Sequence, residues 1–210
     1  MEYDVDMQYG ADIESRMNGL WGDDDIIHGG NGDGTKKQYM FGGDGVDSLH
    51  FGDSWLATYG FGHDGNDKIY LPNDVADVTY YGGDGNDRVY AVPADELNGK
   101  MNTNELGYGG PGDDFMQGSH KLAGTWTAHG RDDDDKIIGG DDTTGDHKAY
   151  GNEGDDHIKG GDGSMALHQL FGDFSEAEIN DREQNGTANG WTLGTGGNDT
   201  IYGGDKSTTG

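Results

Sequence analysis

The sequence predicts an all-β fold, a parallel β-solenoid of about eight coils with a period of 20–21 residues. Two observations lead to this prediction. A nine-residue phrase of turn and strand residues recurs seven times along the 210-residue chain. An aromatic residue or histidine also stands directly before each turn, at steps of 20, 20, 20, 27, 21, 21 and 21 residues: Trp21, Phe41, Phe61, Tyr81, Tyr108, His129, Tyr150 and Phe171. Repetition at a nearly fixed interval is typical of solenoids, in which each repeat packs against its neighbours.

The repeated phrase reads G-G-x-G-x-D-x-U-x, in which U is a large apolar residue. Its clearest copies are residues 42–50 and 82–90, and related copies begin at Gly62, Gly109, Gly130, Gly151 and Gly194. Glycine adopts positive φ without strain, so the first four places predict a tight turn with exposed carbonyl oxygens. Side chains alternate along a strand, so the eighth place should enter a core while the seventh and ninth face outward. The predicted core residues are Leu49, Ile69, Val89, Met116, Ile137, Ile158 and Ile201.

The phrase resembles the nonapeptide of the RTX, or haemolysin-type, calcium-binding repeat family, over most of residues 19–205. The resemblance implies a β-roll with Ca²⁺ between successive coils, held by turn carbonyls and the sixth-place Asp. Calcium takes six to eight oxygen ligands, which these groups can supply. On this basis we expect roughly six to eight ions along the chain. The candidate metal ligands are Gly42, Asp44, Asp47, Gly62, Asp64, Asp67, Gly82, Asp84, Asp87, Gly109, Asp114, Gly130, Asp132, Asp135, Gly151, Asp156, Gly194 and Asp199, with Asp25 in a partial site.

Composition agrees with a metal-dependent fold. The chain has 42 glycines, no cysteine, and 41 acidic against 13 basic residues, which gives a formal charge of −28. Such a charge with low hydrophobicity favours disorder, unless bound metal contributes the free energy of folding. Seven Ca²⁺ ions would reduce the charge from −28 to −14. The acidity argues against nucleic acid or anionic lipid as a partner, and no apolar stretch is long enough for membrane insertion.

The order of the elements follows from the spacing. Residues 1–18 are predicted as an N-terminal cap and residues 19–210 as the β-roll, with irregular excursions near 91–107 and 174–190 and a short helix at 175–179. A β-roll of the resembling family uses 18 residues per coil, so the longer period predicts an irregular turn opposite each tight one. These opposite turns lack the sixth-place Asp, so we expect one calcium row, along one edge, interrupted near Gly172. They are residues 29–37, 51–57, 71–77, 91–104, 118–124, 139–146 and 160–165.

The aromatic column before the turns allows three interpretations. Facing outward, it could stiffen the solenoid by stacking, or it could form a docking face for a partner chain or a polysaccharide. Alternatively, the irregular turns could shift the strand parity so that the column points inward. A second column stands two residues earlier and begins with Tyr39 and Tyr59. The residues proposed for docking or self-association are Phe41, Phe61, Tyr81, Tyr108, Tyr150 and Phe171.

Function is predicted from the calcium motif. No nucleophile–base pair or phosphate loop stands out, so we expect no enzyme activity and assign no catalytic residue. The leading prediction is a calcium-dependent folding and spacer module of a secreted or cell-surface bacterial protein. The alternatives are a self-assembling or adhesive surface element and an accessory module of a secreted polysaccharide-modifying or hydrolytic enzyme. The start of the chain lacks Sec signal features, and the RTX resemblance implies type I secretion of a parent protein.

Overall fold

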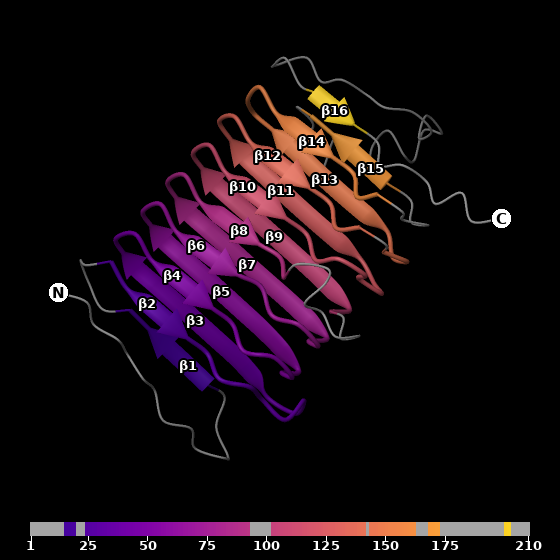
Figure 1. The fold of residues 1–210 in the computed structure, drawn as a ribbon. Coiled ribbons are helices and arrows are strands. Elements are labelled where there is room, and N and C mark those ends of the chain that lie inside the picture. The colour runs from indigo at the N-terminus through magenta and orange to yellow at the C-terminus, as the bar shows by residue number, and fades with distance from the viewer. Residues whose placement is uncertain are drawn as a thin grey trace, which may run out of the picture.

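The computed structural model describes residues 15–19, 24–92, 102–141, 143–162, 168–172 and 200–202. Throughout these residues the chain forms strands and turns, without a helix, and winds into a β-solenoid of two parallel sheets (Figure 1). The predicted fold class is therefore confirmed. Six coils, from β3/β4 to β13/β14, are described through the tight turn that joins their strands, slightly fewer than the eight predicted.

Each coil contributes one longer and one shorter strand, and the two kinds form separate eight-stranded sheets. The odd-numbered sheet comprises β1 (Ser15–Asn18), β3 (Lys37–Asp44), β5 (Ala57–Asp64), β7 (Asp77–Asp84), β9 (Asn104–Pro111), β11 (Trp126–Asp132), β13 (His147–Asn152) and β15 (His168–Phe171). The even-numbered sheet comprises β2 (Ile26–His28), β4 (Ser48–His50), β6 (Lys68–Tyr70), β8 (Arg88–Tyr90), β10 (Phe115–Gln117), β12 (Lys136–Ile138), β14 (His157–Lys159) and β16 (Thr200–Tyr202). Strand β1 lies within the segment predicted as a cap and pairs in parallel with β3.

Equivalent residues of successive coils pair in register despite the unequal spacing. Phe41 pairs with Phe61, and Tyr81 pairs with Tyr108 across the one long step of the chain. The additional residues of that step lie before β9, on the edge opposite the tight turns, so they leave the register unchanged. Part of the predicted excursion at 91–107 and all of the one at 174–190 fall outside the described residues, as do the predicted helix at 175–179 and the candidate ligands Gly194 and Asp199.

The core is a single layer of apolar side chains between the two sheets. The eighth-place residues from Leu49 to Ile158 are at most 1% exposed, as predicted, whereas Ile201 in the last strand is only half-buried. The odd-numbered sheet supplies the facing residues, which include Met40, Tyr80 and Ala128. Large and small residues alternate there from Met40 to Gly107, and Tyr80 fills the space beside Gly107, where a Cβ would overlap its ring.

The aromatic column faces outward, which decides between the orientations left open by the sequence. In β3 the exposure alternates, so that Met40 is buried and its neighbours Tyr39 and Phe41 are half-buried on the other face. The rings stack along the solenoid axis, with centroids of Phe41 and Phe61 5.0 Å apart and their planes 5° from parallel. The stack continues through all seven members from Phe41 to Phe171.

We predict that Gly107→Ala destabilises the solenoid by about 2 kcal/mol, because overpacking a filled core typically costs 1–3 kcal/mol. The added methyl group would overlap the Tyr80 ring. The measurement is the melting temperature in excess calcium, followed by circular dichroism. The double variant Gly107→Ala/Tyr80→Leu should recover part of the loss, since leucine leaves room for the methyl group. A double variant less stable than the single one would contradict this account of the core.

Candidate metal centre

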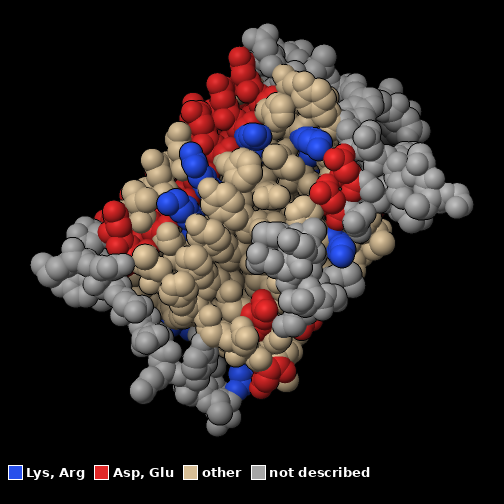
Figure 2. Space-filling model, in the orientation of Figure 1, with Lys and Arg blue, Asp and Glu red and all other residues tan. Residues whose placement is uncertain are grey.

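The tight turns form one continuous edge of the solenoid, at the upper left of Figure 1. Each turn joins a long strand to a short one and passes through positive φ at its second and fourth places. In the first described turn these are Gly43 and Gly45, with φ of 120° and 132°. This backbone is open to glycine and strained for other residues, which explains the glycines of the repeated phrase. Figure 2 shows acidic side chains gathered along this edge.

The sixth-place Asp residues form a buried ladder behind the turns. Every Asp from Asp47 to Asp156 at this place is at most 3% exposed. Each uses its Oδ1 to accept a hydrogen bond from the backbone N–H of the equivalent Asp one coil earlier. The Asp67 N–H, for example, donates to Asp87 Oδ1 over 2.8 Å. The ladder begins with the Asp25 N–H, which donates to Asp47 Oδ1. The partial site predicted at Asp25 therefore joins the row.

The second carboxylate oxygen of these residues has no hydrogen-bond partner among the described residues. The Oδ2 atoms concerned are buried and belong to Asp47, Asp67, Asp87, Asp114 and Asp135. Each lies over the first glycine of its own turn, where it converges with the carbonyl oxygen of the first glycine in the next coil. A Cβ on Gly62 would collide with both Asp67 Oδ2 and the Gly82 carbonyl oxygen. The first place must therefore be glycine, because these two oxygens occupy the space of a side chain.

Burial makes this row of carboxylates difficult to ionise. Adjacent parallel strands are about 4.8 Å apart, so each carboxylate faces like charges above and below. Loss of solvation is the largest cause of the rise in pKa, and the Asp of the neighbouring coil adds to it. The resulting pKa values are about 6 for Asp67, about 7 for Asp87, about 8 for Asp114 and about 9 for Asp135. At neutral pH the row thus requires protons or bound cations.

The donor set suits a hard cation. Among the described residues, no group of three or more His, Cys, Asp or Glu side chains is placed to hold a metal ion. An ion on this edge would therefore take backbone carbonyls together with single carboxylates. Carbonyl and carboxylate oxygens are the ligands that calcium uses, whereas zinc favours thiolate and imidazole. The paired Oδ2 and carbonyl oxygen over each first glycine fit that chemistry.

The candidate ligands divide into two groups by position. The first-place glycines Gly42, Gly62, Gly82, Gly109, Gly130 and Gly151 and the sixth-place Asp residues lie together on the buried side of the turns. The third-place residues point away from the row, because their side chains are exposed: Asp44, Asp64, Asp84 and Asp132. Only their backbone could contribute to a site between coils. The Asp64 carbonyl, for instance, accepts the Gly45 N–H over 2.8 Å.

A second, exposed ladder at the fifth place was missed by the sequence reasoning. Here the fifth-place side chain of one coil accepts a hydrogen bond from the backbone N–H of the fifth-place residue in the next coil. The Asn86 N–H, for example, donates to Asn66 Oδ1 over 2.7 Å. Asn86, Asp113 and Asp134 continue it. The signal was present, since nearly all fifth places carry Asn or Asp, but the nonapeptide pattern leaves that place unrestricted. The two ladders connect the coils in opposite directions and fix the turns on one another.

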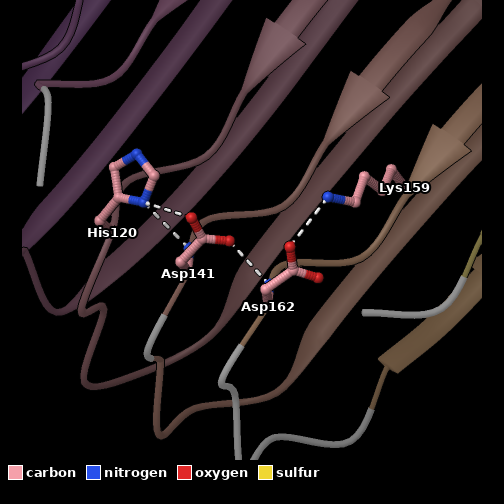
Figure 3. Close-up of polar contacts among 4 residues, drawn as sticks. All are labelled: His120, Asp141, Lys159 and Asp162. Atoms are coloured by element: carbon pink, nitrogen blue, oxygen red, sulfur yellow. Dashed lines mark hydrogen bonds and ion pairs between the residues drawn. The ribbon is translucent and has the colours of Figure 1, made fainter. Parts of the chain in front are cut away.

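The opposite edge has shorter ladders whose acids are paired. Figure 3 shows one of them, in which the Asp141 N–H donates to His120 Nδ1 over 3.1 Å and the Asp162 N–H donates to Asp141 Oδ1 over 2.7 Å. Lys159 lies 3.0 Å from the Asp162 carboxylate and His120 lies 3.4 Å from that of Asp141. Both acids are half-exposed. Within the described part of the chain, this edge shows no buried carboxylate oxygen that lacks a partner.

Comparisons with protein-family models, with curated proteins and with solved structures each gave no match to this chain. No helix of the described residues is long and apolar enough to cross a membrane. The functional argument therefore depends on the geometry of the turns and on the motif.

We predict that, in excess chelator, the solenoid is more stable at acid than at neutral pH. The unfolded pKa of Asp is about 3.9, and the folded values of about 6 to about 9 are higher, so folding takes up protons. This stabilisation is complete below the unfolded pKa and is lost as the pH rises through the folded values. Melting curves between pH 4 and 9 would measure it, and a melting temperature that rises with pH across this window would contradict it.

Proposed function

We propose that the chain is a calcium-binding structural module of RTX type, whose coils are connected by ions along the tight-turn edge. The observation that supports this proposal is the row of buried Asp Oδ2 atoms without partners, each converging with a carbonyl oxygen of the next coil. The residues that would hold the ions are Asp47, Asp67, Asp87, Asp114 and Asp135, with the first-place glycine carbonyls. Roughly six to eight ions over the whole chain would follow from one ion per turn.

Calcium would provide the positive charge that the row lacks at neutral pH. A divalent ion between two coils neutralises two carboxylates and replaces the water they lose on burial. Ions that bind only the folded state stabilise it by RT ln(1 + [Ca]/Kd), about 2.7 kcal/mol per site at a hundred times Kd. The module would therefore fold where calcium is abundant. This fits a secreted or cell-surface protein exported in an unfolded state, by type I secretion of its parent, and assigns no catalysis to this segment.

A second candidate is an adhesive or assembling surface, which the outward aromatic column favours. Tyr81 is the most exposed ring of that column, at 36%. However, the rings stack face to face at about 5 Å, so neighbouring coils already cover the ring faces. A polysaccharide that stacks on aromatic faces would find only their edges. This geometry favours stiffening of the solenoid over docking. A partner that docked on the column would have to contact the ring edges.

We predict that, at pH 7.5 in chelator, the chain is largely disordered and gains β structure cooperatively with calcium. Magnesium should substitute poorly, because it demands small octahedral sites and retains its waters. Circular dichroism during a calcium titration measures the transition. Residues 132–136 match the enteropeptidase recognition string, so cleavage after Lys136 supplies a second readout. In calcium that bond lies in β12, where Ile137 is buried, and should resist the protease. A β-rich spectrum in chelator that calcium leaves unchanged would contradict the proposal.

We predict that Asp87→Ala lowers calcium affinity and stability far more than Asp84→Ala. The two residues belong to one turn and carry the same charge, but Asp87 is 1% exposed within the ladder and Asp84 is exposed. Removing Asp87 leaves the buried Asp67 N–H without its acceptor, which costs about 1–3 kcal/mol, and removes an oxygen from the proposed site. Isothermal titration and melting in calcium test both effects. Equal losses in the two variants would contradict a buried ligand row.

A further inference from the structure

The outer face of the even-numbered sheet is free of carboxylates. It consists of the seventh- and ninth-place residues of the eight short strands, none of which is Asp or Glu. This is notable in a chain with 41 acidic and 13 basic residues. The face carries Lys, Arg, His and aromatic side chains instead. The acids of the described residues thus lie mostly in the turns, whereas this face carries basic residues and no acid.

Three cations of this face lie in one row, which we call the basic row: Lys68, Arg88 and Lys136. All three occupy the seventh place and are exposed. Lys68 pairs with Arg88 in the sheet, and Phe115 separates Arg88 from Lys136. No ion pair joins any of them to a described residue. The row is therefore available to an anionic partner.

The exposed third-place side chains form a parallel acidic row along the tight-turn edge, seen in Figure 2: Asp44, Asp64, Asp84, Asp132 and Glu153. The two rows have the same sequence of charges over the four coils that begin at Gly62, Gly82, Gly109 and Gly130, whereas Asp44 precedes Ser48 and Glu153 precedes His157 in the outer coils. Asp64 precedes Lys68, Asp84 precedes Arg88, and Asp132 precedes Lys136 by four residues each. In the one described coil whose third place is the uncharged Pro111, the seventh place is the uncharged Phe115.

We infer that the basic row is a docking surface for the acidic row of a second copy of this chain, packed side by side, parallel and in register. Two copies of one solenoid have the same repeat of about 4.8 Å, so Asp64, Asp84 and Asp132 of one copy can each meet a cation of the other. A shift by one coil would place Pro111 opposite a cation and an Asp opposite Phe115. The break concerns the third place alone, because the same turn carries the exposed Asp113 at its fifth place. The shared repeat favours a second copy, since a foreign polyanion would not have the spacing of the coils.

The contact is heterologous, because each copy uses a different surface on its two neighbours. A pair of molecules therefore leaves one basic row and one acidic row free, and association continues into open-ended assemblies. Exposed ion pairs are individually weak and screened by salt. We expect association that is detectable only at high protein concentration and that disappears at about 1 M salt. This inference goes beyond the proposed function and concerns the calcium-loaded protein.

The test is sedimentation velocity of the whole chain in calcium, at about 0.05 M and about 1 M salt. Variant A, Lys68→Glu/Arg88→Glu/Lys136→Glu, reverses the basic row. Variant B, Asp64→Lys/Asp84→Lys/Asp132→Lys, reverses the acidic row at side chains that point away from the ladder. The control, Lys36→Glu/Lys121→Glu/Lys148→Glu, makes the same change in charge elsewhere. Circular dichroism confirms that each variant folds.

We expect the wild type and the control to associate at low salt, A and B alone to be monomeric, and an equimolar mixture of A and B to associate again. Variant A retains its acidic row but offers no basic row to a further molecule. Adding it to wild type should therefore terminate the assemblies and shorten them. This test does not require B to fold. A monomeric wild type overturns the inference, as does equal association by variant A. Salt-sensitive binding of polyglutamate to a monomeric wild type, abolished in A, would show instead that the face serves a foreign polyanion.

Discussion

The repulsion among buried carboxylates is the constraint on which this solenoid depends. One Asp per coil is placed behind the turns, where its Oδ1 accepts the N–H of the coil before it and so sets the coil spacing. The same placement puts a row of like charges in a poorly solvated position. The placement that aligns the coils therefore also creates a repulsion between carboxylates, which opposes stacking until each charge is neutralised. A protein of this design would fold once these charges are neutralised, whether by protons or by bound cations.

The backbone of the turns shows a second cost that bound ions would offset. Three described turns carry residues other than glycine at the places that need positive φ. Arg131 and Asp133, in one turn, have φ of 101° and 73°, His63 has 81° and Asn152 has 79°. Left-handed backbone costs about 1–2 kcal/mol for a residue with a Cβ. The turn that begins at Gly130 is thus the least favourable on its own, and it also holds Asp135, whose pKa is raised to about 9 by loss of solvation.

The sequence predicted the period and the eighth-place core, because each depends on a strict repeat. It did not predict the buried hydrogen-bonded ladder of the sixth-place Asp residues. It could not predict the orientation of the aromatic column, which depends on the strand parity across irregular turns. Nor could it show that third-place acids such as Asp84 point outward, since that direction follows from the sign of φ at the places around them. The pairing of Tyr80 with Gly107 joins residues of two coils with an unusual spacing, so no local pattern revealed it. The calcium site itself remains a prediction.

The two edges of the solenoid carry different constraints, and this difference explains how the chain tolerates unequal coils. On the tight-turn edge, the sixth-place ladder runs through every described coil and the fifth-place ladder is interrupted only at Val46, so an inserted residue there would break hydrogen bonds to the neighbouring coils. On the opposite edge the ladders are short and exposed, and the hydrogen bond from Val75 N to Asn102 Oδ1 spans the one coil of 27 residues. Asn102 also binds the Pro72 carbonyl and the buried Glu105. A single side chain thus closes the longer coil onto its neighbour, while the register is maintained from the other edge.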